Sequence, residues 1–152
     1  MVQSLGRVFV HVVFATKLRR PSPALLMPTI AELNEYMAGI LDNLGCPPVW
    51  VNGYLEHMHP FFVLSRTLAI SRVVGELKTA STKWVRERVP GSSDFEWQRG
   101  YAAFSVSPGR VERTRKYIEG QEAHHRRKAF LNEIRGMLLK AGAEFDERLW
   151  SE

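Results

Sequence analysis

Residues 49–65 read VWVNGYLEHMHPFFVLS, and they hold two extended runs in direct succession. The first run, residues 49–55, contains the pair Asn52-Gly53, which is typical of a bulge or a turn. The second run, residues 57–65, contains the apolar segment FFVL and predicts a buried strand. Two strands in succession, with helical segments before and after them, predict the central β-β step of a mixed α and β fold.

The sequence on both sides of this stretch supplies the remaining elements. Residues 7–16, RVFVHVVFAT, are almost wholly apolar and predict a central strand that is buried on both faces. A capping box at Thr29-Ile30-Ala31-Glu32 opens a helix that ends near Gly45. The other expected elements are a helix from Thr67 to Pro90, a strand over 97–106, a helix over 107–127 that opens at Ser107-Pro108, and a last helix from about Phe130 to Gly142.

The expected order is β-α-β-β-α-β followed by helices. This order is typical of the split βαβ fold, also called ferredoxin-like or RRM-like, an α+β fold whose antiparallel sheet has its helices on one face. The C-terminal helices carry Tyr117. Residues 1–152 are expected to form one domain, because a chain of 152 residues that is 45% hydrophobic can bury one core.

The charge and the cysteine content indicate which kind of binding partner and which cell compartment suit the protein. The net charge of +5 and the pI of about 9.7 suit a polyanionic partner. The single cysteine, Cys46, excludes an internal disulfide and fits a reducing compartment. The sequence has neither a signal-peptide pattern nor an apolar run of the roughly 18 residues that a membrane span needs. A cytoplasmic protein with no membrane partner is the simplest expectation.

His57 and His59 are the first candidates for a site. Strand side chains alternate between faces, so these two imidazoles share one face while Met58 points to the opposite, core face. Two imidazoles on one face can chelate a divalent cation. The spacing alone equally fits histidines that are hydrogen-bonded to neighbours or solvated. Pro60 lacks an N–H and argues against a regular central strand at this point.

Tyr117 and Gln121 are the second pair of candidates. Four residues apart on the expected helix, they share a face, and Gly120 lies between them in a helix of weak amphipathicity. A tyrosine with a pKa near 10 is a poor nucleophile unless a base or a metal-polarised phosphate assists it. Gln121 can offer a carbonyl oxygen to Mg²⁺ or Mn²⁺. A solvated terminal helix is the alternative interpretation.

Basic residues gather in several clusters along the chain. Any one cluster is most simply a solvated face, but together with nearby Trp84, Trp97 and Tyr101 they fit a groove for single-stranded nucleic acid. The candidate nucleic-acid-binding residues are Lys17, Arg19, Arg20, Lys78, Lys83, Arg110 and Arg113.

At these motifs the sequence resembles the small single-tyrosine transposases of bacterial and archaeal insertion sequences, which are HUH endonucleases. The resemblance covers nearly the whole chain. It rests on the following motifs: Glu56-His57-Met58-His59, Glu76-Leu77-Lys78 with Ser81 and Trp84, the segment WQRGYAAFSVS at 97–107, Tyr117-Ile118 with Gln121, and His124-His125-Arg126. Glu56 stands where aspartate is common in the family, and Pro60 where leucine is common.

The resemblance implies roles for the candidate residues. His57, His59 and Gln121 would bind Mg²⁺ or Mn²⁺, and Tyr117 would attack single-stranded DNA to leave a 5′-phosphotyrosine and a 3′-hydroxyl. A later attack by another 3′-hydroxyl would rejoin the strands. The family further implies recognition of DNA hairpins at element ends, and a homodimer in which the tyrosine acts in trans. Two other functions stay open, a non-catalytic protein that binds single-stranded DNA or hairpins, and a metal-dependent hydrolase that uses water.

Overall fold

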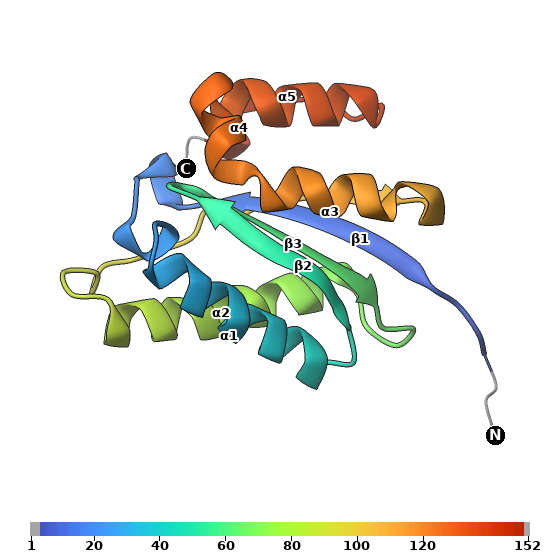
Figure 1. Cartoon of the computed structure of the whole chain (residues 1–152), viewed down its shortest axis with the longest axis horizontal. Coiled ribbons are helices and arrows are strands. Elements are labelled where there is room, and N and C mark those ends of the chain that lie inside the picture. Colours follow the sequence, from blue (N-terminus) through green and yellow to red (C-terminus); the bar gives the residue numbers. More distant parts are fainter. Residues whose placement is uncertain (1–3, 151–152) are drawn as a thin grey trace.

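A computed structural model describes residues 4–150, apart from the side chains of residues 126 and 127. Its core is a four-stranded antiparallel sheet in the order β2-β3-β1-β4 (Figure 1). The strands are β1 (Val8–Ala15), β2 (Pro48–Tyr54), β3 (His57–Leu64) and β4 (Ala102–Val106). This topology confirms the predicted split β-α-β-β-α-β fold. The strand predicted over 97–106 is shorter than expected, with an isolated bridge between Trp97 and Thr16 before it.

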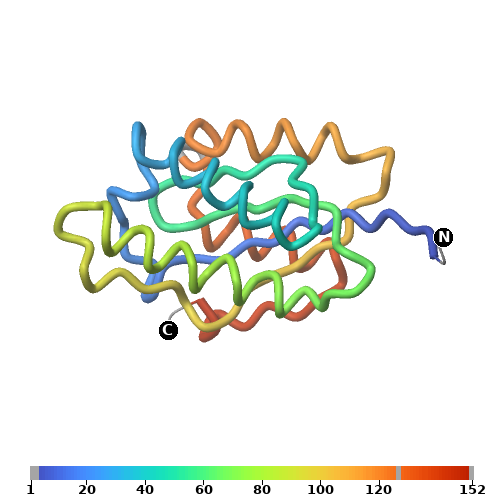
Figure 2. Tube along the Cα trace, turned by 90° about the horizontal axis from the view of Figure 1, so that it is seen from below, coloured from blue at the N-terminus to red at the C-terminus, as the bar shows by residue number. Residues whose placement is uncertain are grey.

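Helices cover both faces of the sheet, whereas the sequence predicted helices on one face. The helices α1 (Thr29–Asn43) and α2 (Ile70–Arg88) lie together across one face (Figures 1 and 2). The helices α3 (Val111–Glu119), α4 (Gln121–Arg127) and α5 (Phe130–Lys140) lie over the other face (Figure 1). Short 3-10 turns occupy Lys17–Arg19, Pro23–Leu25, Pro108–Arg110 and Glu147–Trp150.

The alternation of side chains along the strands explains both layers. Val12 and Phe14 of β1, and Met58 and Phe62 of β3, are buried in the core beneath α1 and α2. Burial of each such side chain stabilises the fold by about 1.5–3 kcal/mol. The intervening side chains of both strands face the second layer, where His11 is buried. The predicted core position of Met58 is therefore observed, and the histidines beside it face α3, α4 and α5.

β3 passes through Pro60 without a change of register. Phe61 pairs with His11 of β1, and Met58 pairs with Phe14, so the two pairs are three positions apart on each strand. On the other side, Pro60 itself pairs with Val51 of β2. The β1–β3 ladder is interrupted at His59 and Pro60, and β2 has a bulge between Pro48 and Trp50, opposite Phe61 and Phe62. β3 therefore continues through Pro60 with local irregularities rather than as a fully regular central strand.

The helix predicted over 107–127 is divided at Gly120. α3 ends at Glu119 and α4 begins at Gln121, and Gly120 leaves the helical geometry with ψ near 23°. The side-chain amide of Asn52 on β2 donates to the carbonyls of Ile118 and Glu119, at 3.0 and 3.2 Å. These bonds satisfy carbonyls at the end of α3 that no longer have intrahelical partners. The division thus depends on a strand residue far away in the sequence.

Three of the expected helix starts also differ. α1 begins at Thr29 itself, and Pro28 before it supplies no side-chain cap, so the capping box does not form. α2 is preceded by Ala69 rather than capped by Thr67. Ser107 makes no side-chain cap bond and leads into a 3-10 turn before α3. Among the helices of residues 4–150, none combines the length and the apolarity that crossing a membrane requires.

Candidate active site

The four predicted site residues come together between β3 and the second helical layer. His57, His59 and Gln121 are fully buried, and Tyr117 is half-buried. Nε2 of His57 lies 2.9 Å from Oε1 of Gln121. The Tyr117 ring stands edge-on to His59 with ring centroids 5.9 Å apart. The strand and the helices therefore bring two imidazoles, one amide and one phenol of the same chain into one site.

The contact between His57 and Gln121 fits a cation. Nδ1 of His57 donates to Oε1 of Glu56 at 2.8 Å, so in the neutral ring Nε2 carries a lone pair. The amide nitrogen of Gln121 donates to the Tyr117 carbonyl at 3.3 Å, which turns its oxygen toward His57. With Nε2 protonated, the His57 ring donates a hydrogen bond to this oxygen; with Nε2 deprotonated, both atoms are acceptors and a cation can lie against both. The donor set therefore suits a divalent metal.

His59 offers a second open nitrogen. Its Nδ1 lies 2.8 Å from Nε2 of His11, a hydrogen bond between two buried rings. Burial lowers the pKa of His11 to about 3, and burial together with neighbouring histidines lowers the pKa of His59 well below its ordinary value. Both rings are thus neutral, which is the form that binds metals. Nε2 of His59 is buried without a hydrogen-bond partner.

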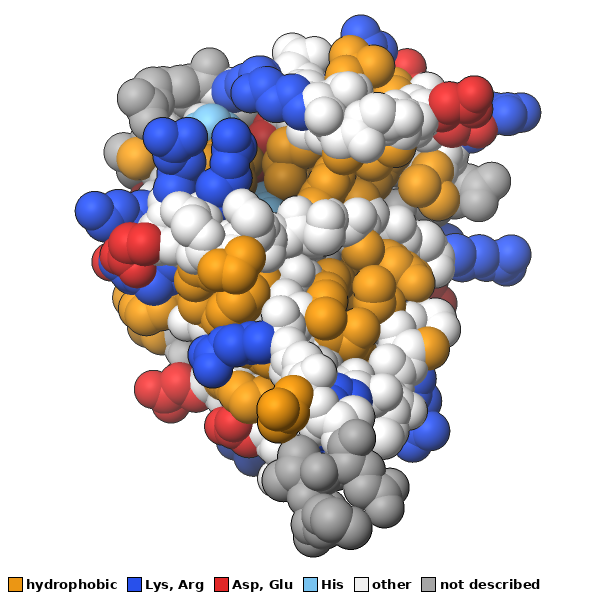
Figure 3. All heavy atoms as spheres, turned by 90° about the vertical axis from the view of Figure 1, so that its right-hand side faces the viewer, with side chains coloured by type: hydrophobic (Ala, Val, Ile, Leu, Met, Phe, Trp, Pro, Cys, Tyr) orange, Lys and Arg blue, Asp and Glu red, His pale blue; other side chains and the backbone are white. Residues whose placement is uncertain are grey.

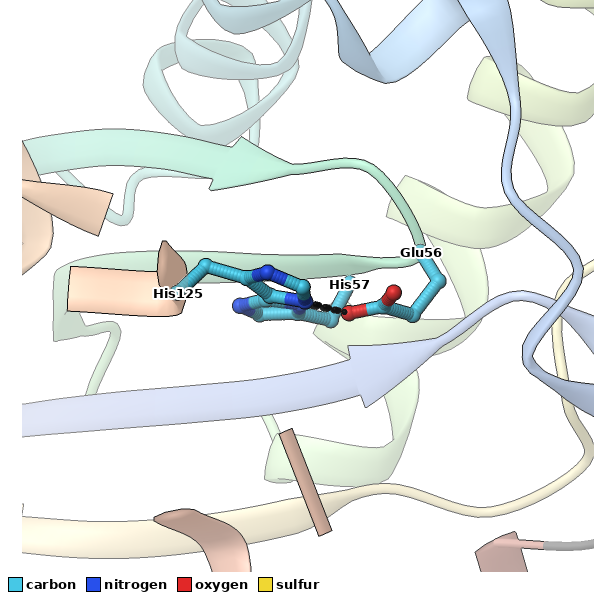
Figure 4. A group of neighbouring side chains, drawn as sticks. All are labelled: Glu56, His57 and His125. Carbon is cyan, nitrogen blue, oxygen red and sulfur yellow. Dashed lines mark hydrogen bonds and ion pairs between the residues drawn. The ribbon is translucent and has the colours of Figure 1, made fainter. Parts of the chain in front are cut away.

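Glu56 and His125 lie against His57, and the His125 ring stacks on the His57 ring at a centroid distance of 5.6 Å (Figure 4). Oε1 of Glu56 accepts hydrogen bonds from His57 and from Nε2 of His125, both at 2.8 Å. Burial alone would raise the pKa of Glu56, but the hydrogen bonds and charges of these two histidines hold it below its ordinary value. A carboxylate on the far nitrogen of a metal-binding histidine fixes the ring and its tautomer. Glu56 therefore positions His57.

Replacing Glu56 with alanine is expected to weaken Mn²⁺ binding by about 10- to 100-fold, the usual effect of losing such an outer carboxylate. Isothermal titration calorimetry of the purified chain measures this change. Glu35→Ala, on the exposed side of α1, is the matched control and should leave the affinity unchanged. Wild-type affinity in the Glu56 variant would show that the ring of His57 is held by other contacts.

Tyr117 is held by a residue that sequence reasoning missed. Its hydroxyl donates to Oε1 of Glu133, a buried side chain of α5. Burial, and to a lesser degree the charge of Glu56, raises the pKa of Glu133 to about 8. A signal was present in the sequence, because Glu133 interrupts the apolar side of a helix that buries Phe130 and Ile134. His11 is a similar interruption of an apolar strand.

A cavity of about 350 Å³ opens onto Tyr117. Its walls include His11, Tyr117 and Glu133, together with the predicted residue Arg113. Lys and Arg side chains surround histidine atoms in a hollow on the face in Figure 3. The cations that line the cavity are Arg113, Lys128 and Lys140. An anion that reaches the phenol would therefore meet positive charge.

A larger groove of about 1020 Å³ lies along α2, the helix on the opposite face of the sheet. It brings together the predicted residues Lys17, Lys78 and Lys83, and adds Arg86 and Arg99. The Lys78 ammonium donates to the carbonyls of residues 98 and 100, both at 2.7 Å, so it also holds the loop before β4. Burial lowers the pKa of Lys78 to about 8.

The other predicted basic residues lie elsewhere. Arg19 donates to the carbonyl of Trp150 at 2.9 Å. Arg20 lines a small cavity of about 190 Å³ between the loops at 16–23 and 91–96. Arg110 is exposed in the turn before α3. The predicted basic set is thus divided between separate surfaces.

Comparisons with known proteins agree with this fold. The family model for IS200-like transposases matches residues 4–121. A provisionally assigned transposase of Deinococcus radiodurans R1, solved at 1.90 Å, superposes with a TM-score of 0.62 at 21% identity, over 80% of this chain and 95% of that one. A REP-associated tyrosine transposase bound to a REP hairpin gives a TM-score of 0.57 at 15% identity, over 82% of this chain and 74% of that one. No curated protein sequence matches.

Proposed function

This chain belongs to the family of IS200-like transposases, and we propose that it is a DNA transposase that cuts and rejoins single-stranded DNA with Tyr117 as the nucleophile. The observation that carries the proposal is the half-buried phenol of Tyr117 beside His59, in a site where His57 faces an amide oxygen. A phenol that serves only as packing has no need of an adjoining set of open ligand atoms.

In the proposed reaction each residue has a distinct part. His57, His59 and Gln121 would hold Mg²⁺ or Mn²⁺, which when bound polarises a phosphate oxygen as a Lewis acid. The phenolic oxygen of Tyr117 forms a bond to phosphorus, the P–O3′ bond breaks, and a 3′-hydroxyl is released. Attack by another 3′-hydroxyl on the phosphotyrosine breaks the bond to Tyr117 and restores the phenol. One phosphodiester replaces another, so no external energy source is needed.

The experiment that tests this function is incubation of the full chain with single-stranded DNA and Mn²⁺. A covalent protein–DNA adduct that survives denaturing electrophoresis is expected. Multiple turnover without any adduct would instead indicate the water-dependent hydrolase. DNA binding with no cleavage would indicate the non-catalytic binding protein.

We also propose that the DNA includes a hairpin, by analogy with the related fold that was solved with a REP hairpin. The expected homodimer with tyrosine acting in trans stays a prediction from the family resemblance. Within the chain itself, Tyr117 lies beside the histidines of the same chain, with centroids 6.4 Å from His11 and 5.9 Å from His59.

The basic groove along α2 is proposed to bind the DNA backbone. We expect the affinity for single-stranded DNA to fall steeply as the salt concentration rises. In a plot of log binding constant against log salt concentration, each neutralised phosphate should contribute about −0.7 to the slope. Lys83→Gln should weaken binding to all sequences and reduce this slope by about 0.7, the share of one phosphate contact. Fluorescence anisotropy at several salt concentrations measures both effects.

Arg72→Gln is the matched control for this prediction. Arg72 lies on the same helix, but its side chain pairs with Glu76 at 3.0 Å and is not among the residues that line the groove. The Arg72→Gln variant should leave the salt dependence of DNA binding unchanged. An equal loss in both variants would mean that overall charge, rather than the groove, governs binding.

A further inference from the structure

Glu133 stands out among the buried polar groups of the described residues. It lies on α5, beyond residue 121 where the match to the family model ends. Only 3% of its surface is exposed. Oε1 accepts the hydrogen bond from Tyr117, whereas Oε2 is buried without a hydrogen-bond partner and lies 3.8 Å from Nε2 of His124. A buried carboxylate is costly unless it is fully hydrogen-bonded, paired with a cation or bound to a metal.

The geometry around Glu133 points toward the histidines. Oε1 of Glu133 lies 3.7 Å from Nε2 of His59, beyond hydrogen-bond distance, and that nitrogen is itself buried and unpartnered. One ligand atom from each of His57, His59 and Glu133 lies within 4.8 Å of the other two. Ligand atoms about 2.1 Å from one ion lie roughly 3–4 Å apart, so one cation can contact all three once the most distant atoms draw in to this spacing.

We propose that Glu133 is a fourth protein ligand of the metal, and that the same carboxylate holds the Tyr117 hydroxyl beside it. This inference rests on the proposed function, because it concerns the same metal. The hydrogen bond to Tyr117 occupies one of several lone pairs of the carboxylate, which leaves others for a cation.

The charge of the site supports a carboxylate ligand. His57, His59 and Gln121 are neutral donors, so without Glu133 a buried divalent cation would keep its whole charge. One carboxylate halves that charge. Two imidazoles, one amide and one carboxylate are four ligands, and an octahedral ion such as Mg²⁺ then keeps two positions for phosphate oxygens or water. Glu133 would thereby connect α5 to both the metal and the nucleophile.

The test is the affinity for Mn²⁺ alone, measured on the full chain from the electron paramagnetic resonance signal of free Mn²⁺. Glu133→Gln keeps the size and an acceptor oxygen for Tyr117 but removes the charge. We expect its affinity to fall on the order of 100-fold. Its thermal midpoint without metal should stay close to that of the wild type, because the amide keeps the size of the side chain and an acceptor oxygen for Tyr117. If the amide variant does not fold, Glu133→Met fills a similar volume, with the same expected loss of affinity.

Two further variants separate a ligand from a residue that only holds Tyr117. Tyr117→Phe removes the hydrogen bond but keeps the carboxylate, and Glu35→Gln changes an exposed carboxylate of α1. Both should bind Mn²⁺ as the wild type does. Wild-type affinity in Glu133→Gln would overturn the inference, and the proposed function would stand if the wild type still forms its adduct through Tyr117. A wild-type chain that binds no Mn²⁺ would overturn both the inference and the metal-dependent part of the proposed function.

Discussion

Replacing Tyr117 with phenylalanine is expected to abolish the covalent protein–DNA adduct, with a loss of cleavage on the order of 10⁴-fold or more. The variant lacks the only oxygen of that ring that can attack phosphorus. It keeps the ring that packs against His59 and His124, at centroid distances of 5.9 and 4.9 Å. Folding should change by only about 1 kcal/mol, the usual value of one hydrogen bond. Denaturing electrophoresis with labelled DNA detects the adduct, and anisotropy checks that DNA binding is retained.

Tyr36→Phe is the matched control for this variant. Tyr36 lies on α1, on the opposite face of the sheet, where its ring stacks on Trp84 at a centroid distance of 5.8 Å. The Tyr36→Phe variant, which lacks this hydroxyl, should form as much covalent adduct as the wild type. An adduct that persists in Tyr117→Phe would remove Tyr117 from the role of nucleophile and would redirect attention to another hydroxyl.

The second large effect is expected from His57→Ala and His59→Ala. Each removes an imidazole whose Nε2 points into the site, and each should abolish cleavage and reduce Mn²⁺ affinity below detection by calorimetry. Both side chains are fully buried, so each variant should also lose about 1–3 kcal/mol of stability. A chelator should stop cleavage by the wild type, and added Mn²⁺ should restore it.

His125→Ala serves as the comparison for these variants. His125 is only partly buried, bonds to Glu56 and stacks its ring on His57 at a centroid distance of 5.6 Å, so its loss should weaken Mn²⁺ binding by no more than about 10- to 100-fold. Thermal unfolding shows whether a variant has lost only the metal or has also misfolded, because a variant that folds correctly should keep a cooperative unfolding transition. Cleavage at the wild-type rate by a folded His57→Ala or His59→Ala would be incompatible with a metal held by the two histidines.

The order of the elements and the direction of the strand side chains could be predicted from local sequence. Apolar runs separated by turn residues predicted four strands, and the two-residue period predicted that Met58 would face the core and that His57 and His59 would share the other face. The motif spacing also indicated the transposase family, which the family model confirms. All of these inferences rely on residues a few positions apart, whose relative directions the backbone geometry dictates.

The break in the predicted helix at Gly120 and the polar contacts of the site depended on residues far apart in the chain. The division of the last predicted helix at Gly120 needs Asn52, and the polar group of the site joins His11, Glu56 and Glu133 from one strand, one turn and one helix. Local periods carry no information on distances across such separations. Residues 57 and 59 could be assigned to one face from sequence because the strand period links them, whereas the approach of Glu133 to Tyr117 and His59 follows from how α5 packs its Phe130 and Ile134 against the sheet.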